Sequence, residues 1–298
     1  MNTSINFNFH RVISVLKRDL IENKKTNLYR LFGCYAMLCV FFILNSSAMN
    51  IDSVYDYGHT AEFFYQRFCN NVLGVVIFFW ILLSEYAASL IMENMNTKEK
   101  RISYLMLPAT MLEKFVSRGI YVVFSVIVVF AISLPLAEIT RLITVPIFDL
   151  PQEFKKFCLF DVAKMFIDQH KEPLIVGGIP YSYTLYMFTY FMSYVWVHSL
   201  FILGGSFFYT RAFIKTLAIM FSMAIIAGLL LANIIDSSFI NFIGNISSDL
   251  SRTSANTVLC ITSLVLIALT VLNWWLGYYL FCKSQITDRK LFRIWFRR

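Results

Sequence analysis

Six apolar runs, each about twenty residues or longer, constrain the fold of this chain more than any other feature. At about 1.5 Å per residue, each run is long enough to cross the hydrocarbon core of a bilayer as an α-helix. We therefore predict an all-α integral membrane protein with a six-span transmembrane domain over residues 28–282. The predicted spans are Leu28–Met49, Asn71–Met92, Leu112–Ile139, Tyr181–Leu203, Ala212–Ile235 and Thr257–Cys282.

The composition favours a membrane protein over a soluble one. Hydrophobic residues make up 58% of the chain and charged residues only 15%, whereas soluble domains are nearer half apolar and a quarter charged. The formal net charge of +8 raises the question of a nucleic-acid partner. Because the Lys and Arg residues lie beside the ends of the apolar runs, we predict contacts with membrane lipids and none with nucleic acid.

The Lys and Arg residues are distributed unevenly over the predicted loops. With the N-terminus inside, the cytoplasmic segments carry 19 of the 26 Lys and Arg residues, and the outer segments carry seven. Cytoplasmic loops of membrane proteins are enriched in these residues. We therefore predict a multi-pass protein of the cytoplasmic (inner) membrane, with both termini in the cytoplasm.

The polar, basic stretch Glu93–Gly119 interrupts the apolar pattern between the second and third runs. Asn96 and Glu99 have the spacing of a reciprocal cap at a helix N-terminus. Pro108 disfavours helical backbone in the residue before it, so the helix must end there. We predict a short cytoplasmic helix over residues 97–107, with a plain connecting loop as the alternative.

This predicted helix is amphipathic and leads directly into the third span. Ile102, Leu105 and Met106 fall on one face of it. Thr110 and Glu113 form a second capping pattern immediately before the next apolar run. Basic residues cluster near the start of the helix, at Lys98, Lys100 and Arg101.

Residues 107–114, LPATMLEK, resemble a run found in ABC-2-type permeases, the membrane subunits of one class of ABC transporters. In that family the run reads leucine, proline, two small residues, two variable residues, glutamate and lysine. The six-span layout extends the resemblance over most of the chain. The family's segment is a coupling helix that docks on an ATPase subunit. For this chain the resemblance implies a coupling segment over 94–112, with contacts through Lys98, Arg101, Ile102, Leu105, Met106, Pro108 and Glu113.

The resemblance also implies a function and a set of partners. Such a permease pairs with a second copy or a close relative and with two ATPase subunits, and it commonly works as an exporter. ATP is bound and hydrolysed by the partner, so this chain is expected to be no enzyme and to hold no cofactor. The alternative is a non-transporting membrane scaffold or sensor subunit, which needs the same spans but no nucleotide-dependent partner.

The two ends of the chain are predicted to lie at the cytoplasmic surface. The segment 1–27 contains an amphipathic helical pattern over residues 7–21, with apolar residues at Phe9, Val12, Ile13, Leu16 and Leu20. Such a helix lies either along the lipid headgroups or against protein, and both interpretations remain open. ABC-2 permeases often carry a comparable interfacial helix before the first span. The tail 283–298 holds six basic residues, which suits the inner headgroup surface.

The longest break between apolar runs covers Thr140–Pro180 and is predicted to lie outside. Its segment Pro173–Pro180 fits either a surface hairpin or a dip into the bilayer. Cys69 and Cys158 both fall on this side, and whether they form a disulfide stays open. An amphipathic helical pattern precedes this segment, with apolar residues at Phe157, Phe160, Ala163 and Ile167.

Two further features of the sequence predict local structure in or between the spans. Pro135, near the far end of the third span, predicts a kink there. The break at 236–256 contains two apolar patches, Phe239–Ile243 and Ile246–Leu250. The family resemblance implies short re-entrant or interfacial helices at these two patches.

No catalytic or metal-binding motif occurs in the sequence. It has no G-x-x-x-x-G-K-[ST] phosphate loop, no H-E-x-x-H and no G-x-S-x-G. It also lacks a Cys-x-x-Cys pair, and its four histidines are scattered over both sides and one span, a poor arrangement for metal binding. We therefore predict no catalytic residue and no metal site in this chain.

Polar residues inside the spans are the remaining candidates for function. An ionised Glu85 near mid-bilayer costs on the order of 3 kcal/mol, so it should face protein or water. It then lines a substrate path or a subunit interface, or it lies near the inner surface and pairs with a basic residue. His198 and Asn273 raise the same question, although neutral polar residues more often join two helices by a hydrogen bond. An intramembrane enzyme built on Glu85 and His198 lacks a suitably spaced second catalytic group.

Overall fold

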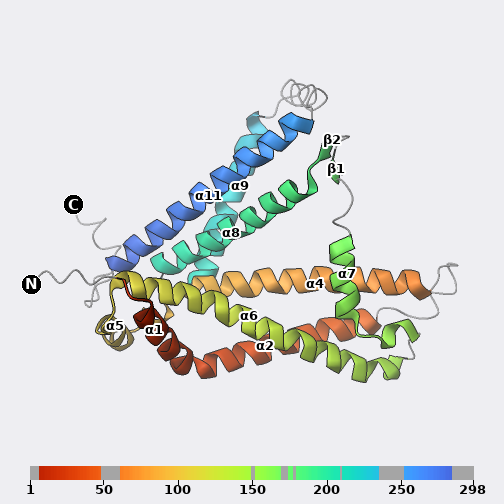
Figure 1. The fold of residues 1–298 in the computed structure, drawn as a ribbon, viewed down its shortest axis with the longest axis horizontal. Coiled ribbons are helices and arrows are strands. Elements are labelled where there is room, and N and C mark those ends of the chain that lie inside the picture. The colour runs from red at the N-terminus through yellow and green to blue at the C-terminus, as the bar shows by residue number, and fades with distance from the viewer. Residues whose placement is uncertain are drawn as a thin grey trace, which may run out of the picture. The chain divides into compact units, whose positions relative to one another are not determined.

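The computed structural model describes residues 7–47, 61–148, 152–168, 174–176, 179–208, 210–234 and 252–283. These residues are predominantly helical (Figure 1). The helices are α1 (Phe9–Glu22), α2 (Lys24–Ser47), α4 (Ala61–Ser89), α5 (Lys98–Leu105), α6 (Met111–Thr144), α7 (Cys158–Asp168), α8 (Tyr183–Phe207), α9 (Ala212–Ile234) and α11 (Arg252–Cys282). Short 3₁₀ turns are η1 (Glu93–Met95), η2 (Val145–Phe148) and η3 (Gln152–Lys155). Two strands are β1 (Leu174–Val176) and β2 (Ile179–Tyr181).

Six helical segments of the described chain are long and apolar enough to cross a membrane. They overlap the six apolar runs, so the prediction of a helical protein with six candidate membrane spans is confirmed. Large apolar side chains are exposed along them, as expected where lipid is the solvent. The segments are Lys24–Ser47, Ala61–Met95, Met111–Ile147, Tyr183–Phe207, Ala212–Leu230 and Asn256–Cys282.

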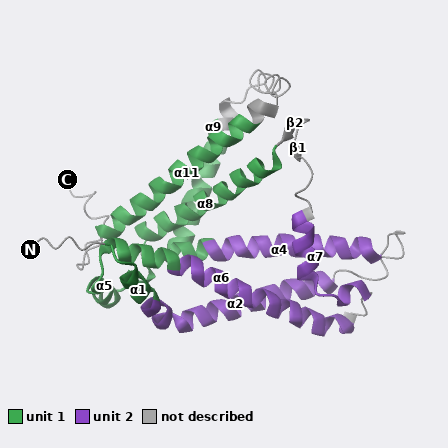
Figure 2. Cartoon of the chain, in the orientation of Figure 1, with its two compact units in different colours: residues 1–16, 85–120, 172–298 green, residues 17–84, 121–171 purple. Residues whose placement is uncertain are grey.

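The chain divides into two compact units, coloured separately in Figure 2. Unit 1 comprises residues 1–16, 85–120 and 172–298, and unit 2 comprises residues 17–84 and 121–171. In unit 1, α8 packs along α11 and also contacts α9. In unit 2, the core is formed by apolar side chains from α2, α4, α6, η3 and α7, among them Leu38, Phe42, Phe68, Ala137, Phe154 and Val162.

The third span is longer than the sequence pattern predicts. It was expected to end at Ile139, but α6 continues to Thr144, with Pro135 inside the helix. The predicted end was wrong because the helix continues past Arg141, the first charged residue after Ile139. In the structure Arg141 lies one turn after Glu138, and the two charges bind each other at 2.7 Å, so they do not end the helix.

The segment after α7 forms a small antiparallel hairpin of β1 and β2. Leu174 pairs with Tyr181, and Val176 pairs with Ile179. This corresponds to the hairpin alternative for Pro173–Pro180. The patches Phe239–Ile243 and Ile246–Leu250, and the tail after residue 283, lie outside the described residues.

Candidate functional site at the start of α6

The first turn of α6 is capped as its sequence predicts. The backbone N–H of Glu113 donates a hydrogen bond to Thr110 Oγ1 at 3.2 Å. In return, the backbone N–H of Thr110 donates to Glu113 Oε2 at 2.8 Å. This reciprocal arrangement satisfies two backbone donors that a helix start otherwise leaves without partners. The capping prediction for Thr110 and Glu113 is confirmed.

The other oxygen of the same carboxylate holds the N-terminal segment. Glu113 Oε1 accepts a hydrogen bond from the backbone N–H of Asn8 at 2.7 Å. It also accepts from Arg11 Nη2 at 2.8 Å and Arg11 Nε at 3.2 Å. Glu113 is fully buried, so a single carboxylate joins the start of α1 to the start of α6. The sequence contains no signal for this contact, because its partners lie about one hundred residues apart.

Lys114, the next residue, attaches α5 to α6. Its Nζ donates to the backbone carbonyl of Leu105 at 2.7 Å, at the C-terminal end of α5. A cation there satisfies an unpaired carbonyl and interacts favourably with the helix dipole. In the opposite direction, the buried hydroxyl of Tyr104 donates to the carbonyl of Lys114 at 3.1 Å. Two hydrogen bonds therefore link the end of α5 to the first turn of α6.

One turn further along, Arg118 attaches the end of the second span. Its Nε donates to the carbonyl of Ile91 at 3.0 Å, and its Nη2 donates to the carbonyl of Leu90 at 2.9 Å. These carbonyls follow the last residue of α4, and that of Leu90 also accepts from the backbone N–H of Glu93 at 2.9 Å. Arg118 is only 1% exposed, and its charge is matched by these fixed dipoles.

Aromatic packing extends this junction to α11. The ring of Phe115 lies 5.8 Å from that of Trp274 and 5.6 Å from those of Tyr278 and Phe281. A Cβ at Gly119 would lie 2.9 Å from Trp274 Cη2, so the site leaves no room for a larger residue. The first two turns of α6 thus contact α1, α5, the end of α4 and α11. We call the residues Glu113, Lys114, Phe115 and Arg118 the α6 junction.

The cap of α5 differs from its prediction. The structure places Thr97 at the cap position, where its Oγ1 accepts from the backbone N–H of Lys100 at 3.3 Å. Asn96 instead follows the turn η1, and its N–H donates to the carbonyl of Glu93. The assignment of the cap to Asn96 was wrong because η1 occupies the chain up to Met95 and moves the helix start one residue onward.

The residues proposed for ATPase coupling fall into three groups by their exposure. Glu113 is buried in the α6 junction and has no exposed surface to offer a partner. Met106 is 76% exposed, and Lys98 and Pro108 are also exposed. The remaining members are half-buried, namely Arg101, Ile102 and Leu105.

Glu85 and His198 are brought together within unit 1. Glu85 lies near the end of α4 and is 4% exposed. Its Oε2 is 3.6 Å from Nδ1 of His198 on α8. Among the described residues, neither side chain has a hydrogen-bond partner within reach. Among the described residues, Glu85 therefore faces an imidazole within the protein and no Lys or Arg side chain.

Asn273 joins two spans. Its side-chain nitrogen donates to Ser199 Oγ at 2.8 Å, in a buried contact between α11 and α8. Further along the same helix pair, Thr189 and Ser263 share a hydrogen bond of 2.9 Å. These contacts are of the kind that polar residues make between membrane helices.

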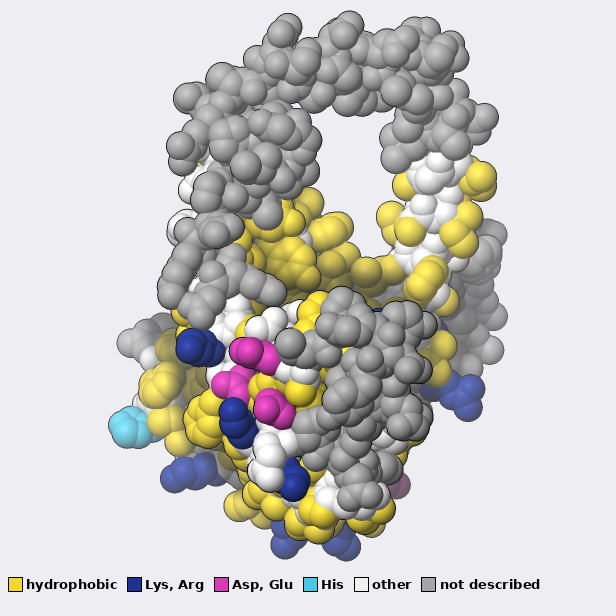
Figure 3. Space-filling model, turned by 90° about the vertical axis from the view of Figure 1, so that its right-hand side faces the viewer, with side chains coloured by type: hydrophobic (Ala, Val, Ile, Leu, Met, Phe, Trp, Pro, Cys, Tyr) yellow, Lys and Arg dark blue, Asp and Glu magenta, His cyan; other side chains and the backbone are white. Residues whose placement is uncertain are grey.

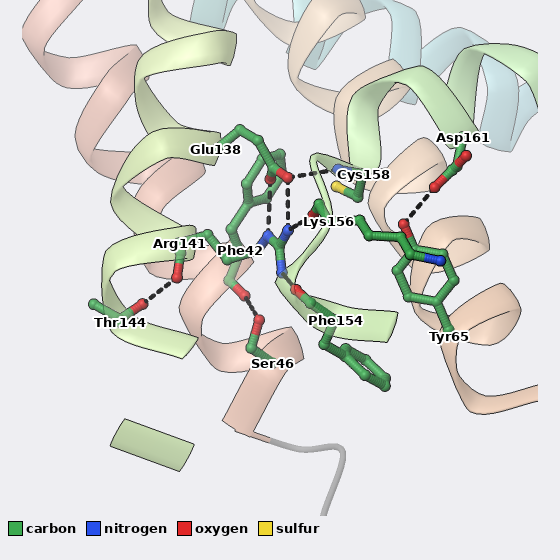
Figure 4. Close-up of polar contacts among 10 residues, drawn as sticks. All are labelled: Phe42, Ser46, Tyr65, Glu138, Arg141, Thr144, Phe154, Lys156, Cys158 and Asp161. Atoms are coloured by element: carbon green, nitrogen blue, oxygen red, sulfur yellow. Dashed lines mark hydrogen bonds and ion pairs between the residues drawn. The ribbon is translucent and has the colours of Figure 1, made fainter. Parts of the chain in front are cut away.

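A second buried polar cluster lies in unit 2 and was not predicted (Figure 4). Arg141 forms a two-pronged ion pair with Glu138, at 2.8 Å and 2.7 Å. It also donates to the backbone carbonyls of Phe154 and Lys156, at 2.9 Å and 2.7 Å. Glu138 in turn accepts from the backbone N–H of Cys158 at 2.7 Å. The cluster therefore fixes the chain between η3 and α7 to the end of α6. The Glu-x-x-Arg spacing is its one trace in the sequence.

Cys69 and Cys158 both lie buried in unit 2 with free thiols. Burial raises the pKa of the Cys158 thiol well above its ordinary value, and the nearby Glu138 carboxylate raises it further. Both effects disfavour the thiolate, which is the reactive form of cysteine.

Two cavities accompany these sites. One, of about 340 Å³ in unit 1, lies beside the coupling segment, and its lining includes Glu93, Asn96 and Arg211. The other, of about 640 Å³ in unit 2, is bordered by α4, η3 and α7. Tyr65 lines it and donates a hydrogen bond to Asp161 at 2.6 Å.

Figure 3 shows acidic and basic side chains gathered on one face of the molecule among hydrophobic ones.

The chain was also compared with known proteins. A scan against protein-family models and searches of curated proteins and of solved structures found no match to the chain. Among the described residues, no group of three or more His, Cys, Asp and Glu side chains is arranged to hold a metal ion.

Proposed function

We propose that this chain is the permease subunit of an ABC-2-type transporter, driven by a separate ATPase subunit. The observation that carries the proposal is the short helix α5 between the second and third candidate spans. It carries the half-buried Ile102 and Leu105 and is followed by the exposed Met106, so a small apolar stripe lies on a polar connecting segment. Exposed apolar surface of this kind commonly marks a partner site. The sequence LPATMLEK, which resembles the family's run, follows directly after it.

The α6 junction supplies a physical route for coupling. A partner that pushes on α5 acts on α6 through Lys114, because Lys114 Nζ binds the last turn of α5 at 2.7 Å. The same two turns of α6 bind the end of α4 through Arg118 and the N-terminal segment through Glu113. Since these contacts are buried and short, a displacement of α5 is transmitted to several spans together.

The proposal includes the expected assembly and direction. The permease pairs with a second copy or a close relative in the cytoplasmic membrane, and its termini and α5 face the cytoplasm. The ATPase subunits bind ATP, while this chain provides the path through the membrane. Export is the proposed direction, and it follows from the family resemblance alone.

The decisive experiment is purification of the natively expressed protein in a mild detergent. The proposal expects a stoichiometric ATPase to co-purify with the chain. A variant with Met106→Asp, prepared in parallel, should retain much less of that ATPase. If no ATPase accompanies the wild-type chain, the non-transporting scaffold or sensor subunit becomes the better assignment.

The orientation is tested by labelling single cysteines with a membrane-impermeant reagent. Of the six native cysteines only Cys260 and Cys282 are exposed. Replacing these two by serine therefore gives a background protein without exposed thiols. We expect Lys155→Cys to react in intact cells and Lys100→Cys to react only after permeabilisation. The opposite pattern would invert the topology and remove α5 from the cytoplasm.

The pairing of Glu85 with His198 is tested by a double-mutant cycle. Each single change, Glu85→Leu or His198→Leu, leaves the other polar group buried without the polar side chain that faces it at 3.6 Å. We therefore expect the double variant to be more stable than the two single effects predict, with a coupling energy of about 1–3 kcal/mol. As a control, Glu85→Leu and Asn273→Leu should be nearly additive, because Asn273 binds Ser199.

The same variants decide whether Glu85 belongs to the transport mechanism. If the pair lines a substrate path or a subunit interface, the stable double variant should insert normally and yet lose transport-linked ATP turnover. Wild-type turnover in Glu85→Leu would exclude Glu85 from the mechanism. Glu85 and His198 would then be structural, as Asn273 is expected to be.

A further inference from the structure

Helix α7 presents an apolar face away from the core of unit 2. Cys158 and Val162 are buried on its inner side, and Leu159 and Met165 pack partly against the core. On the outer side, Phe160 is 76% exposed and Ile167 is 60% exposed. The apolar stripe seen in the sequence, through Phe160, Ala163 and Ile167, is therefore the outward face of the helix. An exposed apolar face of this kind commonly contacts a membrane or another protein.

The contacts of α7 place it at a defined level along the spans. Its first residue is tied to α6, where the N–H of Cys158 binds Glu138. Its second turn is tied to α4, where Tyr65 binds Asp161. At this level both α4 and α6 change from uncharged to charged and polar side chains. Residues 72–84 of α4 and 119–137 of α6 contain no charged side chain, whereas charged and polar side chains occupy both helices from here to their outer ends.

The direction of α7 fits a boundary between lipid and water. Figure 1 shows α7 running across the direction of α4 and α6, which belong with it to unit 2 in Figure 2. A helix crosswise to the spans, at the level where their charges begin, lies in the plane of the headgroups. Lys164 of α7 is exposed and borders the unit 2 cavity beside Asp161. Its stem is long enough to pass apolar surface and reach the phosphates.

We propose that α7 is an interfacial membrane helix whose outward face binds phospholipid of the leaflet nearest the N-terminal end of α4. Phe160 and Ile167 insert between the acyl chains, and Lys164 meets the headgroup phosphates. Lipid is the occupant because the exposed apolar surface continues on α6 at the same level. Ile139 is 48% exposed and Ile143 is 70% exposed there. A docked protein segment would need one bounded patch, whereas lipid covers the whole circumference.

The test is spin-label accessibility of the full chain reconstituted in vesicles of phosphatidylethanolamine and phosphatidylglycerol. Labels are placed at Phe160→Cys and Ile167→Cys, with Cys260 and Cys282 replaced by serine. Relaxation is compared with oxygen, which concentrates in lipid, and with a neutral nickel chelate, which stays in water. Phe124→Cys, on the uncharged part of α6, gives the lipid reference, and Lys155→Cys gives the water reference.

We expect the oxygen-to-nickel accessibility ratio at positions 160 and 167 to be several-fold higher than at 155, approaching the value at 124. A ratio equal to that at 155 would place α7 in water and overturn the proposal. Low accessibility to both reagents would show a protein cover, a second copy or another segment, and would overturn it equally. The experiment needs no ATPase partner, so its outcome is separate from that of the proposed function. Two independent exposed positions guard against one variant that fails to fold.

Discussion

Replacement of Glu138 by alanine is expected to lower the free energy of unfolding by about 3–5 kcal/mol. The change leaves the guanidinium of Arg141 buried, since both side chains of the pair have no exposed surface. It also removes the acceptor for the N–H of Cys158. A buried charge without its partner keeps its full desolvation cost, which is why this effect exceeds that of any surface pair.

The measurement is the melting temperature of the detergent-purified protein, which should fall by about 10 °C. A matched control is Glu22→Ala, which breaks the ion pair of Glu22 with Arg18 on α1. That pair is at 2.8 Å, but its side chains are 26% and 46% exposed, so its loss should cost about 0.5 kcal/mol or less. Equal melting temperatures for the two variants would mean that the Glu138–Arg141 pair is not buried in the folded protein.

A third variant separates the ion pair from the backbone contacts of Arg141. The double change Glu138→Leu with Arg141→Met removes both charges, and such replacements of buried pairs are often neutral or stabilising. Here we expect the double variant to recover only part of the lost stability, because Arg141 also donates hydrogen bonds to the carbonyls of Phe154 and Lys156. Full recovery would show that these carbonyls find other partners.

The second large effect is expected at α5. Met106→Asp should weaken binding of the ATPase subunit by about 30-fold, the loss of a contact worth about 2 kcal/mol. The reason is that an aspartate carboxylate cannot enter an apolar pocket of a partner without losing its hydration. Because Met106 is 76% exposed, the same change should cost the folded chain only about 0.5 kcal/mol, from a negative charge at the C-terminal end of α5.

Met106 makes a cleaner probe than the other two residues of the apolar stripe. Ile102→Asp and Leu105→Asp are also expected to reduce ATPase binding, but both positions are half-buried, so their effects include a cost in folding. Met106→Leu is the conservative control and should bind normally. Binding is measured by titrating the purified ATPase onto each reconstituted variant. Unchanged affinity in Met106→Asp, together with full activity in Ile102→Asp and Leu105→Asp, would refute the coupling role of α5.

Local features of this protein were predictable from the sequence alone. The six spans follow from the length of the apolar runs, because a bilayer of fixed thickness accepts only helices of about that length. The cap formed by Thr110 and Glu113 follows from a spacing of three residues, and both of its hydrogen bonds are present. Such features depend on neighbours along the chain, so the order of residues is enough to specify them.

The contacts that make the α6 junction and the Glu138–Arg141 cluster were decided by tertiary structure. A capping carboxylate that also binds Asn8, or a guanidinium that collects the carbonyls of Phe154 and Lys156, joins residues far apart in the chain. Burial then decides which charges can be tolerated inside, as at Glu138. The outward face of α7 was settled in the same way. Its inner and outward faces both carry apolar side chains, so only packing against α4 and α6 determines which face meets the core and which stays exposed.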